Sequence, residues 1–228
     1  MKTFCIIPAF NEDKTIAKVI AEVKPFIDTI VVVDDGSSDD TYKIVKELSS
    51  ESSELNSLVV LNHLINRGQG AALQTGNQYA IKEKADIIIH FDADGQFIAK
   101  EIRDIIKPIL TNQADIVFGS RFLNKKSHIP WLKKNIILPT AKIVNYLFLN
   151  VKLTDPQNGF RALTHQAAKK IIIENSGMAH CSEIAAKAFQ NNLRIAEIPI
   201  TVIYHNFGQK FSDGFKIIKE LLISRLIN

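Results

Sequence analysis

The sequence is poor in cysteine and lacks a long uncharged apolar run. Only Cys5 and Cys181 occur among 228 residues, which excludes a disulfide framework and favours a reducing compartment. The nearest approach to a membrane span, residues 136–149, is interrupted by Pro139 and Lys142 and is shorter than the ~18–20 residues that a span needs. The apolar run at residues 4–9 is too short for a signal peptide. We therefore expect a cytoplasmic protein.

The sequence also has few glycines and prolines, and its net charge is small. The 10 glycines and 7 prolines follow no period, which excludes collagen-like and repeat architectures. A formal net charge of +4 is too small to argue for a nucleic-acid partner. With 46% hydrophobic and 23% charged residues, the composition is globular, and no Pro/Ser-rich linker divides the chain. We expect residues 1–228 to form a single domain.

Apolar strand patterns alternate with amphipathic helix patterns over the first half. Continuous apolar strands are typical of a parallel sheet buried on both faces. The predicted fold class is therefore α/β, with a Rossmann-like, mostly parallel sheet and helices on both faces. Strands are expected at residues 3–8, 29–33, 58–62, 86–91, 115–119 and 195–204. Helices are expected at 13–26, 41–48, 70–83, 100–110, 132–149, 166–175, 182–191 and 215–227, and a polar loop and turn at 154–163.

An acidic segment, Asp92-Ala93-Asp94-Gly95-Gln96, follows the fourth predicted strand. Two carboxylates that leave a buried strand together are costly without a counter-charge. A hard divalent cation would neutralise Asp92 and Asp94 and bridge them to substrate phosphates. The alternative is a solvated turn in which the aspartates cap the next helix, and this motif alone does not separate the two.

A second acidic turn, Asp34-Asp35-Gly36-Ser37, follows the second predicted strand. Taken alone, it is best explained as an ordinary turn with helix-capping side chains. Two acidic strand ends in one parallel sheet share an edge, however, and that edge is where open α/β sheets bind ligands. On the functional interpretation, one of these aspartates accepts a hydrogen bond from a base or a ribose.

Glycine and arginine precede the third predicted helix in the segment 66–72. Gly68 and Gly70 allow backbone N–H groups to approach an anion at the helix start, and Arg67 adds a fork of donors. The spacing fits neither the dinucleotide-binding G-x-G-x-x-G pattern nor the P-loop, which argues against a dehydrogenase or a P-loop kinase. A plain glycine turn is the alternative.

Four further charged residues are candidates for a site. Arg121 follows the fifth predicted strand and Arg161 lies in a polar segment, and both could neutralise diphosphate or acceptor anions or be surface arginines. Asp155 precedes a proline and could simply start a turn. Glu183 opens a predicted helix, where a carboxylate also serves as a favourable N-terminal charge.

The histidines and cysteines form no pattern of metal or nucleophile chemistry. Six histidines are dispersed along the chain, and none forms a pair at helical spacing, so no zinc site is expected. His90 lies inside an apolar strand and is expected to be a satisfied core residue. Neither a G-x-S-x-G motif nor a Cys/His arrangement indicates a nucleophile.

Taken in order, these segments resemble family 2 glycosyltransferases, which have a GT-A fold. The likeness runs from about residue 3 to residue 204 and looks most like polyprenyl-phosphate sugar transferases, such as dolichyl-phosphate mannose and glucose synthases. Each motif is weak alone, whereas six in the right order indicate the family without naming the sugar. They are IPAFNE (7–12), VDDGS (33–37), NRGQG (66–70), DADGQ (92–96), GSR (119–121) and DPQNGFR (155–161).

The resemblance implies that residues up to about 120 bind the nucleotide-sugar. Asp92 and Asp94 would form the family's D-x-D element, and Gln96 would assist Mg²⁺ or Mn²⁺ at the donor diphosphate. Asp35 would bind the base. The residues implied for the nucleotide pocket are Pro8, Ala9, Phe10, Glu12, Asp35, Arg67, Gly68 and Asp92.

Residues from about 121 to 228 are implied to form the acceptor side, including C-terminal helices. Arg121 and Arg161 would face phosphate groups in the active site. Asp155 is the first candidate for a catalytic carboxylate, and Glu183 is the second.

The family's chemistry is an inverting transfer from a UDP- or GDP-sugar, with UDP favoured by the resemblance alone. A leaving nucleoside diphosphate gains negative charge, which a divalent ion and arginines stabilise. A hydroxyl acceptor on a glycan needs a base, whereas a lipid phosphate is already an anion. A polyprenyl phosphate is the expected acceptor.

Many members of the lipid-linked branch carry transmembrane helices after the catalytic domain, and this chain is expected to have none. Residues 127–149 and 215–227 are candidates for interfacial helices on anionic lipid, with Trp131 at the headgroups. Both could instead be amphipathic core helices. We expect a cytoplasmic enzyme, for which peripheral contact with the inner face of the membrane is one possibility. The oligomeric state is left open, and a homo-oligomer is one possibility.

Two other functions compete with the transferase. A nucleotidyltransferase on a related scaffold would release pyrophosphate and usually carries a G-x-G-T-R-like segment near the N-terminus, which residues 8–12 do not match. A non-catalytic nucleotide-sugar-binding module would keep the fold without turnover. The presence of Asp92, Asp94, Arg121 and Asp155 argues against that module.

Overall fold

Strands and helices alternate along most of the described chain. The structure is a computed structural model, and it describes residues 1–51, 57–123 and 153–203. The strands are β1 Thr3–Ala9, β2 Thr29–Asp34, β3 Ser57–Asn62, β4 Ile87–His90, β5 Ile116–Ser120, β6 Arg161–Thr164 and β7 Ile195–Pro199. The α-helices are α1 Ile16–Val23, α2 Thr41–Glu51, α3 Gln69–Lys82, α4 Ile102–Leu110, α6 His165–Lys170 and α7 His180–Gln190.

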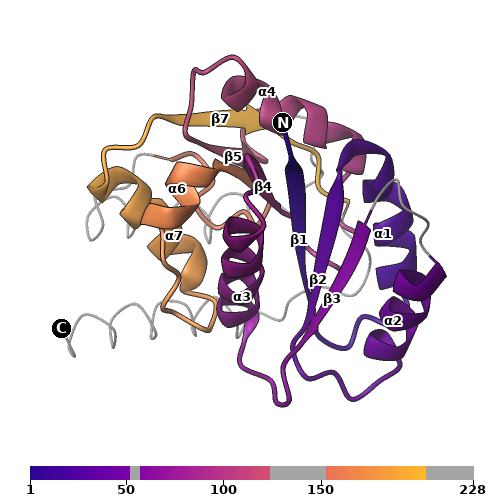
Figure 1. The fold of residues 1–228 in the computed structure, drawn as a ribbon. Helices are drawn as coiled ribbons and strands as arrows, with labels where there is room; N and C mark the ends of the chain where they lie inside the picture. The colour runs from indigo at the N-terminus through magenta and orange to yellow at the C-terminus, as the bar shows by residue number, and fades with distance from the viewer. Residues whose placement is uncertain (52–56, 124–152, 204–228) are drawn as a thin grey trace.

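These strands form one sheet in the order β3-β2-β1-β4-β6-β5-β7 (Figure 1). Neighbouring strands run parallel except at β6, which is antiparallel to both β4 and β5. The predicted α/β class with a mostly parallel sheet is therefore confirmed.

Helices cover both faces of the sheet, as predicted (Figure 1). Helices α1, α2 and α4 contribute to the core on one face, and α3, α6 and α7 contribute to the core on the other. Strand β1 shows the division, because Cys5 and Ile7 belong to the first core and Phe4 and Ile6 to the second. Successive side chains of a strand point to opposite faces, so a strand covered on both sides is apolar throughout. Polar side chains are therefore concentrated at the ends of the strands.

The elements predicted for the first half are confirmed to within a few residues at most ends. The helix expected at 13–26 is shorter, because α1 ends at Val23 and is followed by a 3-10 turn, Lys24–Phe26. Pro25 in this turn has no N–H to donate and so cannot extend the helical hydrogen-bond pattern.

The prediction of a loop throughout residues 154–163 is wrong at its end, because Arg161–Thr164 form β6. Arg161 pairs with His90 of β4 and Phe118 of β5. Two neighbouring strands therefore supply the partners of a four-residue strand that has little pattern of its own. The strand expected at 195–204 ends earlier, at Pro199, which has no N–H for the ladder.

The helix expected at 166–175 is also shorter, because α6 ends at Lys170. Backbone groups beyond it bond to side chains instead: the Ile173 N–H donates to Gln74, and the Asn175 N–H donates to Glu183. The helices predicted at 132–149 and 215–227 lie outside the described residues. Within the described ranges, the structure contains no helix with the length and apolar character of a membrane span.

Candidate active site

The carboxyl ends of the parallel strands lie together at one edge of the sheet. Ala9 of β1, Asp34 of β2 and Asn62 of β3 are neighbours in register, so the segments that follow them begin side by side, at the lower edge in Figure 1. Phe91 follows β4 and donates its N–H to Ile6 of β1, which places residues 92–96 at the same edge. The shared edge expected from the sequence is present.

Asp35 ties the acidic turn after β2 to the glycine turn before α3. Its Oδ1 accepts hydrogen bonds from the Arg67 N–H at 2.9 Å and from His63 Nδ1 at 2.6 Å, and its Oδ2 accepts one from the Gly68 N–H at 2.6 Å. His63 Nε2 lies 2.9 Å from the hydroxyl of Thr75 on α3. The buried carboxylate is thus held by protein donors, and its expected bond to a base stays a prediction.

The glycine turn is packed between Asp35 and the loop that precedes α7. Gly68 has a φ of 94°, which side chains rarely allow, and a Cβ there would lie 2.9 Å from the carbonyl carbon of Ser176. The Gly70 N–H donates to the Ser176 carbonyl at 2.9 Å. The Arg67 side chain is exposed at this edge. Two of the residues implied to lie near the base, Arg67 and Gly68, are therefore fixed through their backbone.

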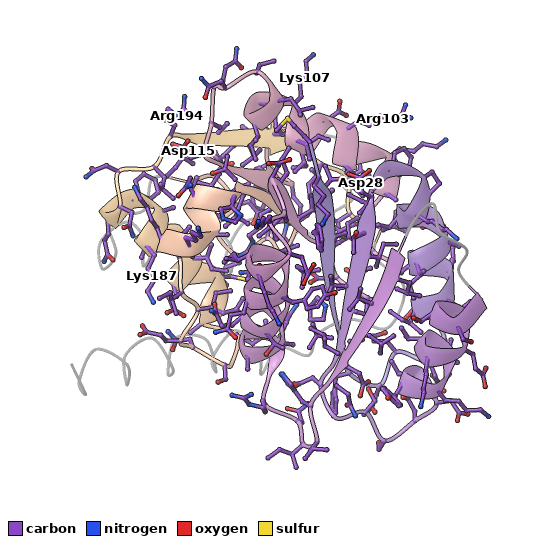
Figure 2. The ribbon with its side chains drawn as sticks, in the orientation of Figure 1. Asp28, Arg103, Lys107, Asp115, Lys187 and Arg194 are labelled. Atoms are coloured by element: carbon purple, nitrogen blue, oxygen red, sulfur yellow. The ribbon has the colours of Figure 1, made fainter. Side chains whose placement is uncertain are left out.

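Glu183 holds the loop before α7 from the other side. Its carboxylate accepts the backbone N–H groups of Glu174 at 3.0 Å and Asn175 at 2.8 Å, and it forms an ion pair with Lys187 at 2.7 Å. Burial opposes ionisation of Glu183, but Lys187 and the two amides lower its pKa overall. Lys187 lies at the outer side of α7 (Figure 2). These contacts favour a structural role, and catalysis by Glu183 stays a prediction.

Asp92 lies between the glycine turn and the polar segment that precedes β6. Its Oδ1 accepts a hydrogen bond from Gln69 Nε2 at 2.8 Å, and a Cβ at Gly159 would lie only 2.5 Å from its Oδ2. Burial, and then the charge of Asp94, raise the pKa of Asp92 to about 7. Asp94 accepts the Gln96 N–H at 3.0 Å. The site therefore holds negative charge that the protein compensates only in part.

Glu12 adds to this negative charge from the end of β1. Burial raises the pKa of Glu12, a hydrogen bond from Thr15 opposes this effect, and the charge of Asp94 reinforces it. The other residues implied at this strand end differ in exposure, since Pro8 and Ala9 are buried and Phe10 is 46% exposed. Their contact with a nucleotide stays a prediction.

The chemistry of this donor set fits a divalent cation. Carboxylate oxygens from Asp92 and Asp94 are ligands that Mg²⁺ and Mn²⁺ prefer, and a cation would offset the burial and the repulsion by Asp94 that raise the pKa of Asp92. In the residues that the structure describes, no three His, Cys, Asp or Glu side chains are grouped to hold a metal ion by themselves. A cation here would need further oxygen ligands, such as those of a diphosphate.

Arg121 forms an ion pair with the buried Asp155 just after the end of β5. Arg121 Nε donates to Asp155 Oδ2 at 2.6 Å, and Nη2 donates to Oδ1 at 2.7 Å, while the Arg121 N–H also donates to Oδ2 at 3.1 Å. The Asp155 residue is 1% exposed. The carboxylate therefore orients the guanidinium, and its expected role as a catalytic carboxylate stays a prediction.

Arg161 lies inside the protein and is 0% exposed. Its Nη2 donates to the Asn158 carbonyl at 2.6 Å and to Cys181 Sγ at 3.1 Å, while Nε and Nη1 have no partner among the described groups. Burial opposes ionisation of the Cys181 thiol, but His180 and Arg161 lower its pKa to about 6. The charge of Arg161 also favours the ionised form of Asp92. Its expected contact with phosphate stays a prediction.

The sequence did not single out His180, Cys181 or His63 as parts of this region. Cys181 reaches Arg161 across 20 residues of sequence, and His63 reaches Asp35 across 28. Such pairs cannot be predicted from local sequence spacing, because they become neighbours only when the sheet is assembled. His90 is a core residue as predicted, but only its Nε2 is satisfied, by Asn77, and its Nδ1 has no partner in the described structure.

The sequence is similar to a known protein family and to several characterised enzymes. A family model described as "Glycosyl transferase family 2" matches residues 4–172. A UDP-N-acetylglucosamine–dolichyl-phosphate N-acetylglucosaminyltransferase from Methanococcus voltae is 36% identical, over 98% of this chain and 96% of that protein. A polyprenol monophosphomannose synthase from Mycolicibacterium smegmatis is 26% identical, over 95% of this chain and 83% of that protein.

Solved structures resemble the chain in fold. Glucosyl-3-phosphoglycerate synthase from Mycobacterium tuberculosis, crystallised with Mg²⁺ and UDP, matches with a TM-score of 0.72 at 18% identity. The match covers 98% of this chain and 79% of that one. The predicted GT-A fold is thereby confirmed.

We predict that Asp35→Asn destabilises the protein by ~2–4 kcal/mol, because donors of Arg67, Gly68 and His63 lose their buried carboxylate partner. Urea-induced unfolding measures this free energy. Asp28→Asn is the matched control: Asp28 also accepts two bonds from another segment, but it is exposed (Figure 2), so its loss should cost at most about 1 kcal/mol. An equal loss in the free energy of unfolding for the two variants would contradict a structural role for the buried Asp35 carboxylate.

Proposed function

The chain belongs to glycosyltransferase family 2 and is an enzyme, and on this premise we propose that it transfers a sugar from a UDP-sugar to a polyprenyl phosphate. The transfer is metal-dependent and inverts the configuration at the sugar carbon. The donor lies at the carboxyl edge of the sheet, and the acceptor phosphate approaches from the side of Arg121.

One observation carries this proposal: the segment between Asp155 and Arg161 touches both halves of the site. Asp155 binds the Arg121 guanidinium at one end of the segment. Gly159, near the other end, lies against Asp92 so closely that a Cβ would be 2.5 Å from its Oδ2. The acidic pair and the arginine therefore belong to one connected site, which suits a reaction between a diphosphate donor and an anionic acceptor.

The metal ligands in this proposal are Asp92 and Asp94, with Gln96 assisting. A bound Mg²⁺ or Mn²⁺ supplies positive charge to the departing diphosphate. Asp92 is suited to this task because Gln69 orients one carboxylate oxygen and Gly159 leaves room beside the other. The N–H of Gln96 holds Asp94 in its turn.

The protein's own residues meet the needs of a phosphate acceptor. An acceptor phosphate is already an anion, so it attacks the sugar carbon without a base to remove a proton. It needs positive charge to hold it beside a negatively charged donor. Arg121 supplies that charge, and Asp155 fixes the direction of its guanidinium. A hydroxyl acceptor would need a free carboxylate base, and the buried Asp155 is engaged by Arg121.

The relatives support the choice of donor and acceptor. The 36%-identical relative is named for UDP-N-acetylglucosamine and dolichyl phosphate, and the mannose synthase is named for a polyprenol. The acceptor lipid lies in a membrane, so we propose that the enzyme works at the membrane surface. We favour UDP over GDP on these names.

The proposal is tested by measuring transfer directly. A thermal-shift screen of UDP- and GDP-sugars with Mn²⁺ identifies the donor, because a ligand raises the melting temperature according to its affinity. The selected donor is then incubated with a short-chain polyprenyl phosphate. We expect a glycosylated lipid phosphate and release of UDP. Release of pyrophosphate, or donor binding without any turnover, would contradict the proposed transfer.

We predict that Asp94→Ala weakens Mn²⁺-dependent binding of UDP at least ~100-fold, because one of two protein carboxylates for the cation is lost. Calorimetric titration of UDP with and without Mn²⁺ measures this effect. Asp104→Ala is the control, since Asp104 is an exposed carboxylate on α4 and should leave UDP affinity unchanged. Unchanged Mn²⁺-dependent affinity in Asp94→Ala would remove Asp94 from the metal site.

A further inference from the structure

Glu197 is a charged residue in the middle of β7, at the end of the sheet. Its neighbours in the strand, Ala196 and Ile198, pack on the core that includes α4. Ile195 packs on the opposite core, which includes α7. Because alternate side chains share a face, Glu197 points to the same side as Ile195. A half-buried carboxylate on a covered face needs hydrogen-bond partners.

Among the described residues, the hydrogen-bond partners of Glu197 are Thr154 and Asp155, which lie 43 and 42 residues away in sequence. Its Oε1 accepts the Thr154 N–H at 2.8 Å, the Thr154 hydroxyl at 2.7 Å and the Asp155 N–H at 3.4 Å. The first two are well within hydrogen-bond range, and the third is long. A single carboxylate oxygen thus fixes the backbone just before and at Asp155.

The Thr154 hydroxyl extends this network to the end of β5. A carboxylate only accepts, so the Thr154 hydroxyl donates its proton to Glu197. The Ser120 hydroxyl, 2.6 Å from Thr154 Oγ1, is then the donor in their contact. Ser120 Oγ accepts the Phe122 N–H at 3.2 Å. The residues on both sides of Arg121 are therefore tied to the segment that Glu197 holds.

Arg121 is the last member of the chain of contacts. Asp155 accepts two hydrogen bonds from the Arg121 guanidinium and one from its backbone N–H. We propose that Glu197 is a positioning residue, which acts through Thr154 and Asp155 to aim the Arg121 guanidinium at the acceptor phosphate. This inference rests on the proposed function for the role of Arg121. The contacts that connect Glu197 to Arg121 do not depend on it.

The variants follow from the chemistry of the contacts. Glu197→Ala removes the acceptor oxygen entirely. Glu197→Gln keeps an oxygen in the same place and should retain most of the contacts, because all three partners are donors. Thr154→Val is a gentler change, since it removes the hydroxyl and leaves the backbone bond. Glu101→Ala is the matched control, because Glu101 also accepts a backbone N–H across the fold, from Thr201 at 3.0 and 3.1 Å.

Two readouts test the proposal separately. The first is the nuclear magnetic resonance signal of the Arg121 Nε–H, identified by its loss in Arg121→Lys, which reports the bond to Asp155 without any substrate. The second is steady-state transfer with the donor chosen in the screen and a short-chain polyprenyl phosphate. For Glu197→Ala we expect a shifted or lost Nε–H signal and an acceptor KM raised at least ~tenfold, with Mn²⁺-dependent UDP affinity unchanged. Glu197→Gln should restore both, and Thr154→Val should show a smaller effect in the same direction.

A double-mutant cycle completes the test. If Glu197 acts through Arg121, Glu197→Ala should not raise the acceptor KM further in an Arg121→Ala background. An unchanged Nε–H signal in both Glu197→Ala and Thr154→Val, or additive effects in the cycle, would overturn the proposal, as would a Glu101→Ala variant with the same defects. A parent enzyme that binds UDP but does not glycosylate polyprenyl phosphate would overturn the proposed function, and the Nε–H signal would still decide the role of Glu197.

Discussion

Asp92 and Asp94 follow the end of a fully buried strand, and several neighbouring residues accommodate the Asp92 carboxylate. Gly159 leaves the space that one oxygen of Asp92 occupies, and Gln69 donates to the other. The buried Arg161 favours the ionised carboxylate. Burial, and then the charge of Asp94, still raise the pKa of Asp92. A divalent cation, and through it a diphosphate, would offset both the burial and the repulsion, which is why we propose a cation site at this edge.

Two other carboxylates at the same edge, Asp35 and Asp155, are engaged by groups of the protein itself. Asp35 binds backbone amides of the glycine turn, and Asp155 binds Arg121. Both carboxylates are buried. Asp35 therefore holds the glycine turn in place, and Asp155 holds the Arg121 guanidinium. Glu197 extends this arrangement to the edge strand β7. Acidic residues that look alike in the sequence thus differ in their surroundings: Asp35, Asp155 and Glu197 hold protein groups in place, whereas Asp92 and Asp94 are the residues for which we propose a ligand.

The sequence predicted the sheet and its faces well, because strands buried on both sides must be apolar throughout and helices carry a regular apolar stripe. It also predicted that the acidic segments after β2 and β4 share an edge. It missed β6, whose four residues gain their partners from β4 and β5. It also missed the bonds of His63 to Asp35 and of Cys181 to Arg161. These contacts depend on how the sheet is assembled, and no local period encodes them.

The central claim is that the acidic pair holds a cation which in turn holds the donor diphosphate. Anomalous diffraction from crystals grown with Mn²⁺ and UDP tests it most directly, since it locates the manganese independently of the protein atoms. The account predicts a manganese peak within bonding distance of the Asp94 carboxylate and of diphosphate oxygens, with Asp92 facing the same ion. A manganese peak away from both aspartates, with UDP bound elsewhere on the sheet, would contradict it.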